Sequence, residues 1–243
     1  MLAPHYARAL LRGCGSRPTF VRGAPDGDAP PVTELLPGED FAVLEYAAGW
    51  AWGYCAADRA VGYVEAIELT EPIAPTHIVC EKSAPVMPDA RVTAPLLASL
   101  PMGARLHGEE CGACLNTEYG CVPLSHLERL DEPAGDPVVI AERLIGTPWL
   151  EGGRSHAGID AGGLVQLALS LCGIAAPRFA DLQRDLGEPV TGTPRHGDLV
   201  LFEGGAGLMI DDLMLIHASR EADKVTTAPL ALIEGAERRR LPL

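Results

Sequence analysis

The chain is poor in positive charge and has no apolar run long enough to cross a membrane. It contains 19 Lys and Arg against 33 Asp and Glu, which gives a formal net charge of −14. Nucleic acids and anionic membrane surfaces would repel such a protein, so neither is expected as a partner. No stretch approaches the ~20 apolar residues of a membrane span. Recognition of a ligand therefore has to come from a shaped pocket.

A secretory signal and an even set of cysteines are also missing. Residues 1–13 include two arginines and no apolar run of signal-peptide length. Seven cysteines is an odd number, so a full disulfide framework is not expected. The default expectation is reduced thiols in the cytoplasm, with export by another route left open.

The composition is that of a folded protein with room for several small domains. Hydrophobic residues make up 47% of 243 residues, which is enough to bury one large core or two to three small ones. The segment from Asp131 to Pro137 is rich in Pro, Gly and acidic residues and is typical of a linker.

The most informative stretch is a glycine-rich turn at residues 152–158, which leads into an apolar segment. Asp160 is placed to cap a helix, because its carboxylate can accept from the free N–H groups of the first turn. Apolar residues then recur at helical spacing as far as Cys172, and Gly173 is typical of a residue that ends a helix. The N-terminus of such a helix is where a cysteine thiolate would be stabilised.

These residues resemble the NlpC/P60 cell-wall peptidases. That family carries Gly-Gly-x-Ser, then Gly-x-Asp-Cys-Ser-Gly-Leu-Val-Gln, with the cysteine as nucleophile. Three further family segments follow here in the right order, and the matching residues are Gly152, Gly153, Ser155, Gly158, Asp160, Gly163–Gln166, Pro177–Gln183, Gly197–Phe202 and Leu215–Ala218. The resemblance covers about 105 residues and implies an α+β, papain-like fold.

The catalytic residues that the resemblance implies are missing. The nucleophile position is Ala161 and the following serine position is Gly162. The family's base histidine would fall at Gly205, and the sequence has no histidine between His196 and His217. His217 matches the third position, which orients the base. Thiol catalysis needs all three groups in hydrogen-bond reach, so the site is predicted to be degenerate.

Other residues of the predicted cleft also depart from the family. Glu151 stands where an aromatic residue is usual, and Phe179 stands where a polar residue is frequent. The predicted cleft residues are Glu151, Ser155, Asp160, Ala161, Gly162, Phe179 and His217. No substitute nucleophile is expected, because Cys172 would lie about 16 Å from Ala161 along the helix axis, and neither Ser155 nor Ser170 has a positioned base. His156 and His196 are expected to be loop residues.

Two small β-rich segments precede this region. Short apolar runs in residues 14–70 are separated by Pro, Gly and Asp, and the run from Gly49 to Tyr54 with Val61–Val64 is similar to a bacterial SH3 (SH3b) domain. Alternation places Trp50 and Trp52 on one face, either in the core of a small barrel or in contact with a ligand. Residues 71–130 resemble a second, weaker copy that closes at Gly120–Pro123.

A Cys-x-x-Cys pair, Cys111 and Cys114, lies in the second segment. A structural zinc site usually combines two such pairs, whereas Cys80 and Cys121 stand alone. Ordinary strand cysteines are therefore favoured, and a metal site or a local disulfide remains the alternative. No metal and no cofactor is predicted.

Together these features predict an α+β protein with SH3b-like domains at 14–70 and 71–130 and an NlpC/P60-like domain at 134–243. The predicted function is that of a pseudoenzyme that binds a cell-wall (peptidoglycan) peptide or a partner protein, or that regulates an active relative. The alternative is a cysteine-type peptidase or amidase that cleaves D-γ-glutamyl bonds in peptidoglycan peptides. The sequence does not indicate an oligomeric state.

Overall fold

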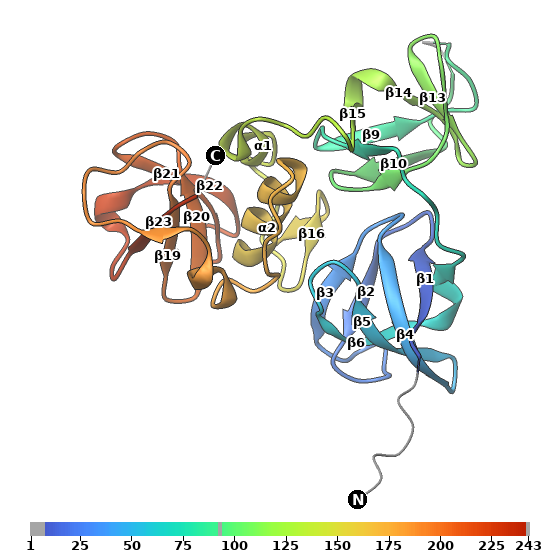
Figure 1. Cartoon of the computed structure of the whole chain (residues 1–243), viewed down its shortest axis with the longest axis horizontal. Helices are drawn as coiled ribbons and strands as arrows, with labels where there is room; N and C mark the ends of the chain where they lie inside the picture. The colour runs from blue at the N-terminus through green and yellow to red at the C-terminus, as the bar shows by residue number, and fades with distance from the viewer. Residues whose placement is uncertain (1–7, 92–93, 242–243) are drawn as a thin grey trace, which may run out of the picture.

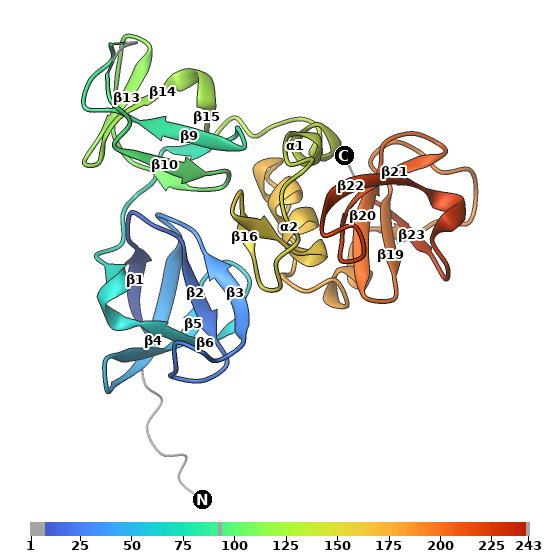
Figure 2. The same cartoon turned by 180° about the vertical axis from the view of Figure 1, so that it is seen from behind.

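The computed structural model describes residues 8–91 and 94–241, which form three units in chain order (Figures 1 and 2). Two β-rich units come first, and a third unit with both α-helices and a six-stranded sheet follows. The helices of the third unit lie on the side of its sheet that faces the β-rich units. Within the described residues, no helix has the length and apolar character needed to span a membrane.

The first unit is one antiparallel sheet of seven strands, ordered β3-β2-β6-β5-β4-β1-β7. Its strands are β1 Leu10–Cys14, β2 Thr19–Arg22, β3 Pro31–Leu35, β4 Asp40–Ala47, β5 Trp50–Cys55, β6 Val61–Glu65 and β7 Leu69–Thr70, with a 3-10 turn at Ala66–Glu68. Strand β1 begins at Leu10, four residues before the predicted start of the domain. It belongs to the unit because it pairs with both β4 and β7.

The second unit consists of three small antiparallel sheets, β10-β9, β11-β8-β15 and β12-β13-β14. Its strands are β8 His77–Val79, β9 Ser83–Val86, β10 Ala98–Pro101, β11 Arg105–Leu106, β12 Glu109–Cys111, β13 Cys114–Thr117, β14 Gly120–Pro123 and β15 Leu127–Arg129, with a 3-10 turn at Leu124–His126. The assignment of this unit as a second SH3b copy remains a prediction.

The third unit packs two helices against an antiparallel sheet ordered β18-β23-β19-β20-β21-β22. Its elements are α1 Pro137–Arg143, β16 Arg154–Ser155, β17 Gly158–Ile159, α2 Ala161–Leu171, β18 Glu188–Pro189, β19 Leu199–Phe202, β20 Gly205–Met209, β21 Met214–Ser219, β22 Lys224–Pro229 and β23 Glu237–Arg240, with 3-10 turns at Leu182–Asp185 and Leu230–Leu232. This is the α+β, papain-like layout.

Helix α2 has the start and end that its sequence predicts. Asp160 is the N-cap residue, and its side chain accepts a hydrogen bond from the Gly163 N–H at 2.8 Å. Cys172 caps the C-terminal end, and Gly173 follows with a φ of +73°, a conformation that glycine adopts without strain. All of its residues except Ser170 are buried, as expected for a helix that is apolar all round.

The sequence pattern predicts a short amphipathic helix from Val138 to Ile145, and the family resemblance implies a helix at Pro177–Gln183; both differ from the structure. Helix α1 begins one residue before the predicted start and ends at Arg143, and Asp136 caps it by accepting from the Val138 N–H at 2.9 Å. The segment from Pro177 to Gln183 is mostly a loop. Its conformation is held by the Gln183 amide, which donates to the Pro177 and Gly162 carbonyls at 3.0 Å each. These bonds satisfy the backbone in a non-helical form.

The three units share part of one apolar core. Leu36 of the first unit and Ile78 and Met102 of the second are buried in the same cluster as α1 and α2. A Cβ added at Gly103 would come within 2.6 Å of Leu167 and 2.9 Å of Leu36, so the turn after β10 approaches both α2 and the first unit closely. The third unit is therefore packed against both preceding ones.

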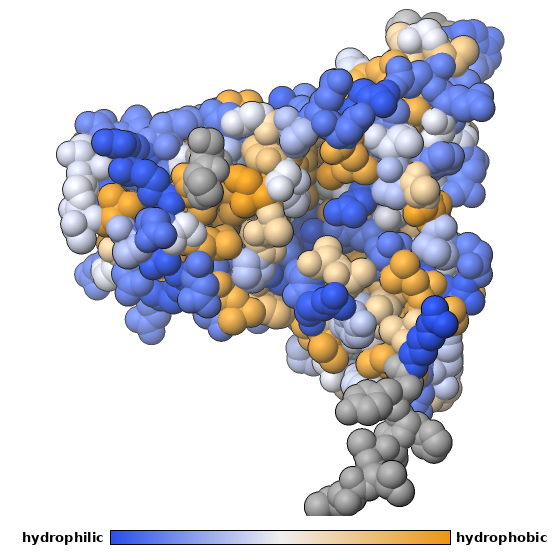
Figure 3. Space-filling view, in the orientation of Figure 1, coloured by the Kyte–Doolittle hydropathy of each residue, from blue (hydrophilic) through white to orange (hydrophobic). Residues whose placement is uncertain are grey.

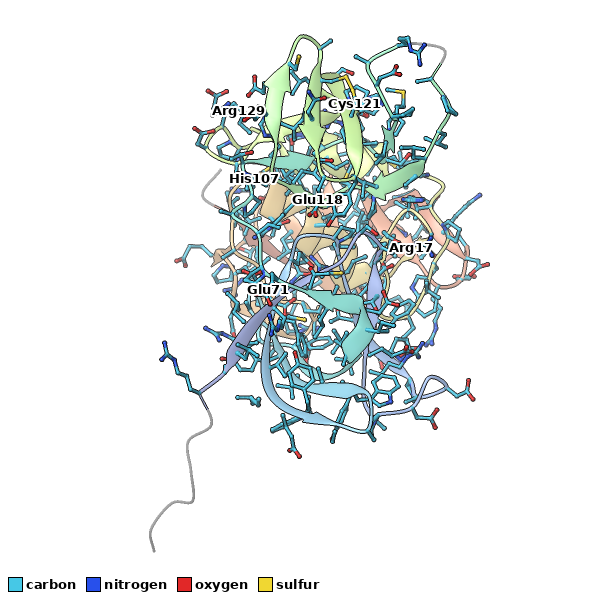
Figure 4. The ribbon with its side chains drawn as sticks, turned by 90° about the vertical axis from the view of Figure 1, so that its right-hand side faces the viewer. Arg17, Glu71, His107, Glu118, Cys121 and Arg129 are labelled. Carbon is cyan, nitrogen blue, oxygen red and sulfur yellow. A yellow bond between two sulfur atoms is a disulfide. The ribbon has the colours of Figure 1, made fainter. Side chains whose placement is uncertain are left out.

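The cysteines of the second unit form a bond that the sequence did not favour. Cys114 and Cys121, on neighbouring strands β13 and β14, are joined by a disulfide (Figure 4). The preference for ordinary strand cysteines was wrong for these two, because strand pairing brings them together. Cys111, which lies opposite Cys114 in the register of β12 and β13, is a free and exposed thiol. No group of three or more potential metal-ligating side chains occurs among the residues placed by the structure.

Candidate functional site

A cavity of about 510 Å³ opens at the N-terminus of α2. Its walls come from the turn before β16, the start of α2, the loop after Pro177, the β19–β20 hairpin and the segment after β21. The lining residues are Trp149, Glu151, Asp160, Ala161, Gly162, Arg178, Phe179, Ala180, Asp181, Arg184, Phe202, Glu203, Gly204, Gly205 and Arg220. The size suits a small ligand or a short peptide.

Asp160 holds the back of this cavity together. Its carboxylate accepts from the N–H groups of Gly152 and Gly163 and forms a two-pronged pair with Arg178, with N–O distances of 2.8 and 2.7 Å. Only 2% of the Arg178 side chain is exposed. Its Nε donates to the Thr33 hydroxyl of β3 at 2.7 Å. The same carboxylate therefore caps the helix, fixes the glycine-rich turn and neutralises a buried guanidinium.

A second buried ion pair joins the glycine-rich turn to the first β unit. Arg154 of β16 donates from both terminal nitrogens to the Glu39 carboxylate at 2.8 and 3.0 Å. The Arg154 backbone N–H and the Ser155 hydroxyl donate to the Glu34 carboxylate at 2.7 and 3.1 Å. Burial opposes ionisation of Glu39, but the attraction and hydrogen bonds of Arg154 hold the pKa of Glu39 below its ordinary value. The pKa of Glu34 is raised, because burial outweighs its hydrogen bonds.

The position predicted for the base is filled by a neighbouring ring. Gly205 begins β20, directly after the two-residue turn from Phe202, and the two residues are paired across the hairpin. A Cβ added at Gly205 would overlap the Phe202 ring. Phe202 also packs edge-to-face against His217, with ring centroids 5.8 Å apart. The phenyl ring therefore occupies the space that a side chain at 205 would need.

The position predicted for the serine is equally closed. A Cβ added at Gly162 would lie 2.5 Å from the Arg178 carbonyl oxygen and 3.1 Å from the Ala180 nitrogen. Because the nearest atoms belong to backbone, a larger residue at 162 requires the loop to move. Ala161, by contrast, has its methyl group in the cavity wall at 6% exposure.

The outer rim of the cavity is charged and aromatic. Glu151 accepts from Arg220 at 3.2 Å, and both side chains are about 70% exposed (70% and 73%). The Arg220 guanidinium lies 4.6 Å from the centre of the Trp149 ring, in cation–π geometry. On the opposite wall the Arg178 guanidinium lies 5.8 Å from the Phe179 ring. Glu151 and Phe179, the two residues that depart from the family, therefore form part of the rim.

Five of the seven predicted cleft residues line the cavity and two do not. Glu151, Asp160, Ala161, Gly162 and Phe179 form part of its wall, as does Gly205. Ser155 is buried against Glu34 and serves the contact between units. His217 is 93% buried behind Phe202, and burial lowers its pKa. These two side chains do not line the cavity, because neighbouring side chains cover both.

The remaining candidates lie elsewhere. Cys172 follows the last residue of α2, and burial raises its pKa to about 11, so its thiol stays protonated at neutral pH. Ser170 donates to the Leu167 carbonyl of its own helix at 2.9 Å. His196 bridges the Ile210 carbonyl and the Asp136 carboxylate. None of these three residues lines the cavity.

The sequence did not reveal which residues cover position 205, nor which residues hold the glycine-rich turn against the first β unit. Phe202 lay inside a recognised segment, and nothing local indicated that its ring would cover position 205. Glu34 and Glu39 carried a usable signal, because two carboxylates flanking the apolar pair Leu35 and Leu36 need buried partners. Trp149 and Arg220 lie outside the motifs and are joined only by folding.

The fold and the cavity together define the class of protein: a papain-like domain preceded by β-rich units. In it, a capped helix opens onto a cavity at the edge of an antiparallel sheet. That geometry usually presents a nucleophile at the first residue of the helix. Among the described residues that line the cavity there is no cysteine, serine, threonine, lysine or histidine.

Comparison with known families assigns both ends of the chain. Residues 146–233 match the NlpC/P60 family, and residues 21–69 match the bacterial dipeptidyl-peptidase SH3 domain. The chain thus carries an NlpC/P60 domain behind an SH3 domain of this bacterial type. The SH3 match covers only the first β unit.

Individual relatives agree with this assignment. Dipeptidyl-peptidase 6 of Lysinibacillus sphaericus is 25% identical over 235 residues, which cover 85% of this chain and 86% of that protein. A probable endopeptidase of Mycobacterium tuberculosis is 29% identical over 107 residues, covering 41% of this chain and 28% of its own length. The crystal structure of an NlpC/P60 family protein from Bacillus cereus has a TM-score of 0.81, with 17% identity, over 95% of this chain and 99% of that one. The fold extends over all three units.

Proposed function

We propose that this protein is a non-catalytic member of the NlpC/P60 group, which binds a cell-wall peptide in the cavity at the N-terminus of α2. The observation that carries the proposal is the lining of the cavity: among its described residues there is no cysteine, serine, threonine, lysine or histidine, and the expected nucleophile and base positions are Ala161 and Gly205. The Phe202 ring lies where a Cβ at Gly205 would be placed, so the base position is covered by a neighbouring side chain.

The other thiols support this proposal. Burial raises the pKa of Cys14, Cys55 and Cys80 as well as that of Cys172, so all four thiols disfavour the reactive thiolate. Cys111, which is exposed, lies on β12 of the second unit and not at the cavity. Cysteine-type hydrolysis therefore lacks a nucleophile at the cavity.

The cavity retains features that suit a peptide ligand. It keeps its open volume of about 510 Å³, and its rim offers both charged and aromatic groups. Arg220 and Glu151 can each bind a charged group of opposite sign, and Trp149 and Phe202 offer apolar surface. A peptide containing a D-γ-glutamyl–diamino acid bond carries carboxylates, amines and short aliphatic segments of this kind.

The test measures binding and turnover on the same samples. The unmodified protein is titrated by calorimetry with a tripeptide containing that bond, and the mixture is then analysed by mass spectrometry for released product. We expect saturable binding with no product. Ala161→Leu, which fills the cavity wall, should abolish binding, whereas Ala175→Leu, which adds the same volume at an exposed site outside the cavity, should not.

Restoration variants separate a lost nucleophile from a rebuilt site. Ala161→Cys combined with Gly205→His is expected to remain inert while Phe202 is present, because the histidine side chain and the ring compete for one space. Product formed in proportion to the concentration of the unmodified protein would overturn the proposal. Product formed by the double variant alone would show that the cavity binds the peptide and that the Phe202 ring yields to a histidine at 205.

A further inference from the structure

A second hollow lies on the first β unit. It has a volume of about 310 Å³ and shares no lining residue with the cavity at α2. Its wall consists of Pro25, Glu45, Ala47, Ala48, Trp50, Trp52 and Tyr63. Three of the chain's twelve Phe, Trp and Tyr residues are therefore gathered at one surface site.

Strand register places these side chains on one face of the sheet. Glu45 of β4 is paired with Trp52 of β5, and Trp52 is paired with Tyr63 of β6. Two residues along, Trp50 lies between Ala47 and Glu65. Residues directly opposite in an antiparallel sheet point to the same face. The three aromatic rings are thus flanked by two carboxylates.

Two other aromatic residues of this unit, Phe20 and Tyr54, have an arginine of the chain beside them. The Arg22 guanidinium lies 5.6 Å from the Phe20 ring, and that of Arg59 lies 5.0 Å from the Tyr54 ring. At the hollow, no arginine or lysine among the described residues contributes to the wall. Arg22 lies opposite Tyr63 in register, but its guanidinium donates to the Ala29 carbonyl at 2.7 Å.

Exposure of these rings has a physical cost that a ligand would remove. Trp52 is 37% exposed, and Trp50 and Tyr63 are partly buried. An indole face attracts a cation, and a neighbouring carboxylate strengthens that attraction. The net charge of −14 favours the approach of a positively charged partner. In Figure 3, hydrophobic residues on the face shown form separated patches among hydrophilic ones, so a general apolar interface is not indicated there.

We propose that the hollow formed by Trp50, Trp52, Tyr63 and Glu45 binds a cationic side chain of a peptide, that is, a positive charge on an aliphatic stem. The stem packs against the rings and Pro25, and the charge lies between the Trp52 face and the Glu45 carboxylate. This site is independent of the cavity at α2.

The probe is N-acetyl-lysine methylamide, with the arginine and norleucine analogues as comparisons. Norleucine has a similar aliphatic stem and no charge. Binding is followed by NMR through the three indole N–H signals, which are assigned by single Trp→Phe substitutions. We expect the lysine or arginine probe to shift the Trp50 and Trp52 signals, with the norleucine probe at least about fivefold weaker. The Trp149 signal, at the other cavity, should not change with this site's occupancy.

Two surface variants test the two components of the site. Trp52→Leu keeps apolar cover and removes the π face, and should weaken the lysine probe about fivefold. Glu45→Gln keeps the shape and removes the charge, and should weaken it about two- to threefold. Both residues are exposed, so folding is expected to survive, and the Trp50 signal reports it.

Three results would overturn the inference. Equal binding of lysine and norleucine probes would show a merely apolar surface. A probe that shifts Trp149 and leaves Trp50 and Trp52 unchanged would place cation binding at the other cavity. Absence of any shift up to the solubility limit of the probes would show that the hollow has no such affinity. The peptide used to test the cavity at α2 is not needed, so failure of either proposal is seen separately.

Discussion

The back and the front of the cavity at α2 differ in how their residues are held and in how closely they match the family. At the back, Asp160, Arg178 and Gln183 lie in segments that match the family, and their side chains form hydrogen bonds with the helix, the glycine-rich turn and the loop. At the front, the positions of the predicted nucleophile and base are Ala161 and Gly205, and a phenyl ring has closed over the second. The framework supports folding whether or not chemistry occurs, so it can persist when the reacting groups are lost.

Removing the ion pair at the back of the cavity should have the largest effect on the free energy of unfolding. Asp160→Ala leaves the Arg178 guanidinium buried without its partner and removes the cap of α2, and we expect a loss of about 3–5 kcal/mol in the free energy of unfolding, measured with urea. Asp160→Asn keeps a capping oxygen and should lose less. A cost below about 1 kcal/mol for the alanine variant would show that the framework is not what holds the cavity.

Disturbing the front should cost less and should depend on one neighbour. Gly205→Ala adds a methyl group against the Phe202 ring and is expected to destabilise by about 1–3 kcal/mol. In a Phe202→Ala background the same change should be nearly neutral. A double-mutant cycle measures the coupling, which should reach about 1 kcal/mol or more. Additive effects would mean that the ring does not occupy the space at 205.

Two histidines sharpen the comparison through opposite pH dependence. Burial lowers the pKa of His217 below its ordinary 6.5, so the unfolded chain binds more protons between the lowered value and 6.5. Its contribution to stability is complete above pH 6.5 and is lost as the pH falls. His217→Gln should therefore flatten the decline in stability below pH 6.5, measured by urea unfolding across that range.

His196 serves as the control of opposite sign. Hydrogen bonds to the Ile210 carbonyl and to the Asp136 carboxylate raise its pKa above 6.5. Its contribution is complete below pH 6.5 and is lost as the pH rises through the raised value. His196→Gln should therefore flatten the decline on the alkaline side. Identical profiles for the two variants would contradict both assignments.

The smallest effect on stability is expected at the rim. Glu151→Gln breaks an ion pair with Arg220 in which both side chains are about 70% exposed (70% and 73%), so the free energy of unfolding should change by less than about 0.5 kcal/mol. Peptide binding should change more than stability, because the variant alters the charge of the rim. Loss of stability without any change in binding would place Glu151 in the framework.

Much of the third unit follows from local residue patterns. The Asp160 cap, the apolar length of α2 and the glycine after it are short-range features, and each acts through neighbouring backbone groups. The strands at Leu199–Phe202 and Met214–Ser219 coincide with the segments Gly197–Phe202 and Leu215–Ala218 that match the family. These parts of the fold and the position of Ala161 at the start of the helix could be predicted from the sequence.

Only the tertiary structure decided which groups fill the space around that helix. The Phe202 ring over Gly205, the pairing of Cys114 with Cys121 and the docking of Glu34 and Glu39 on the Arg154 turn depend on strand register and on packing between units. Residues in these contacts are up to 120 positions apart in the sequence, and no local pattern specifies which residues become partners. The sequence by itself determined that the positions expected for the nucleophile and the base hold Ala161 and Gly205. Packing decided that the cavity stays open while the Phe202 ring covers position 205.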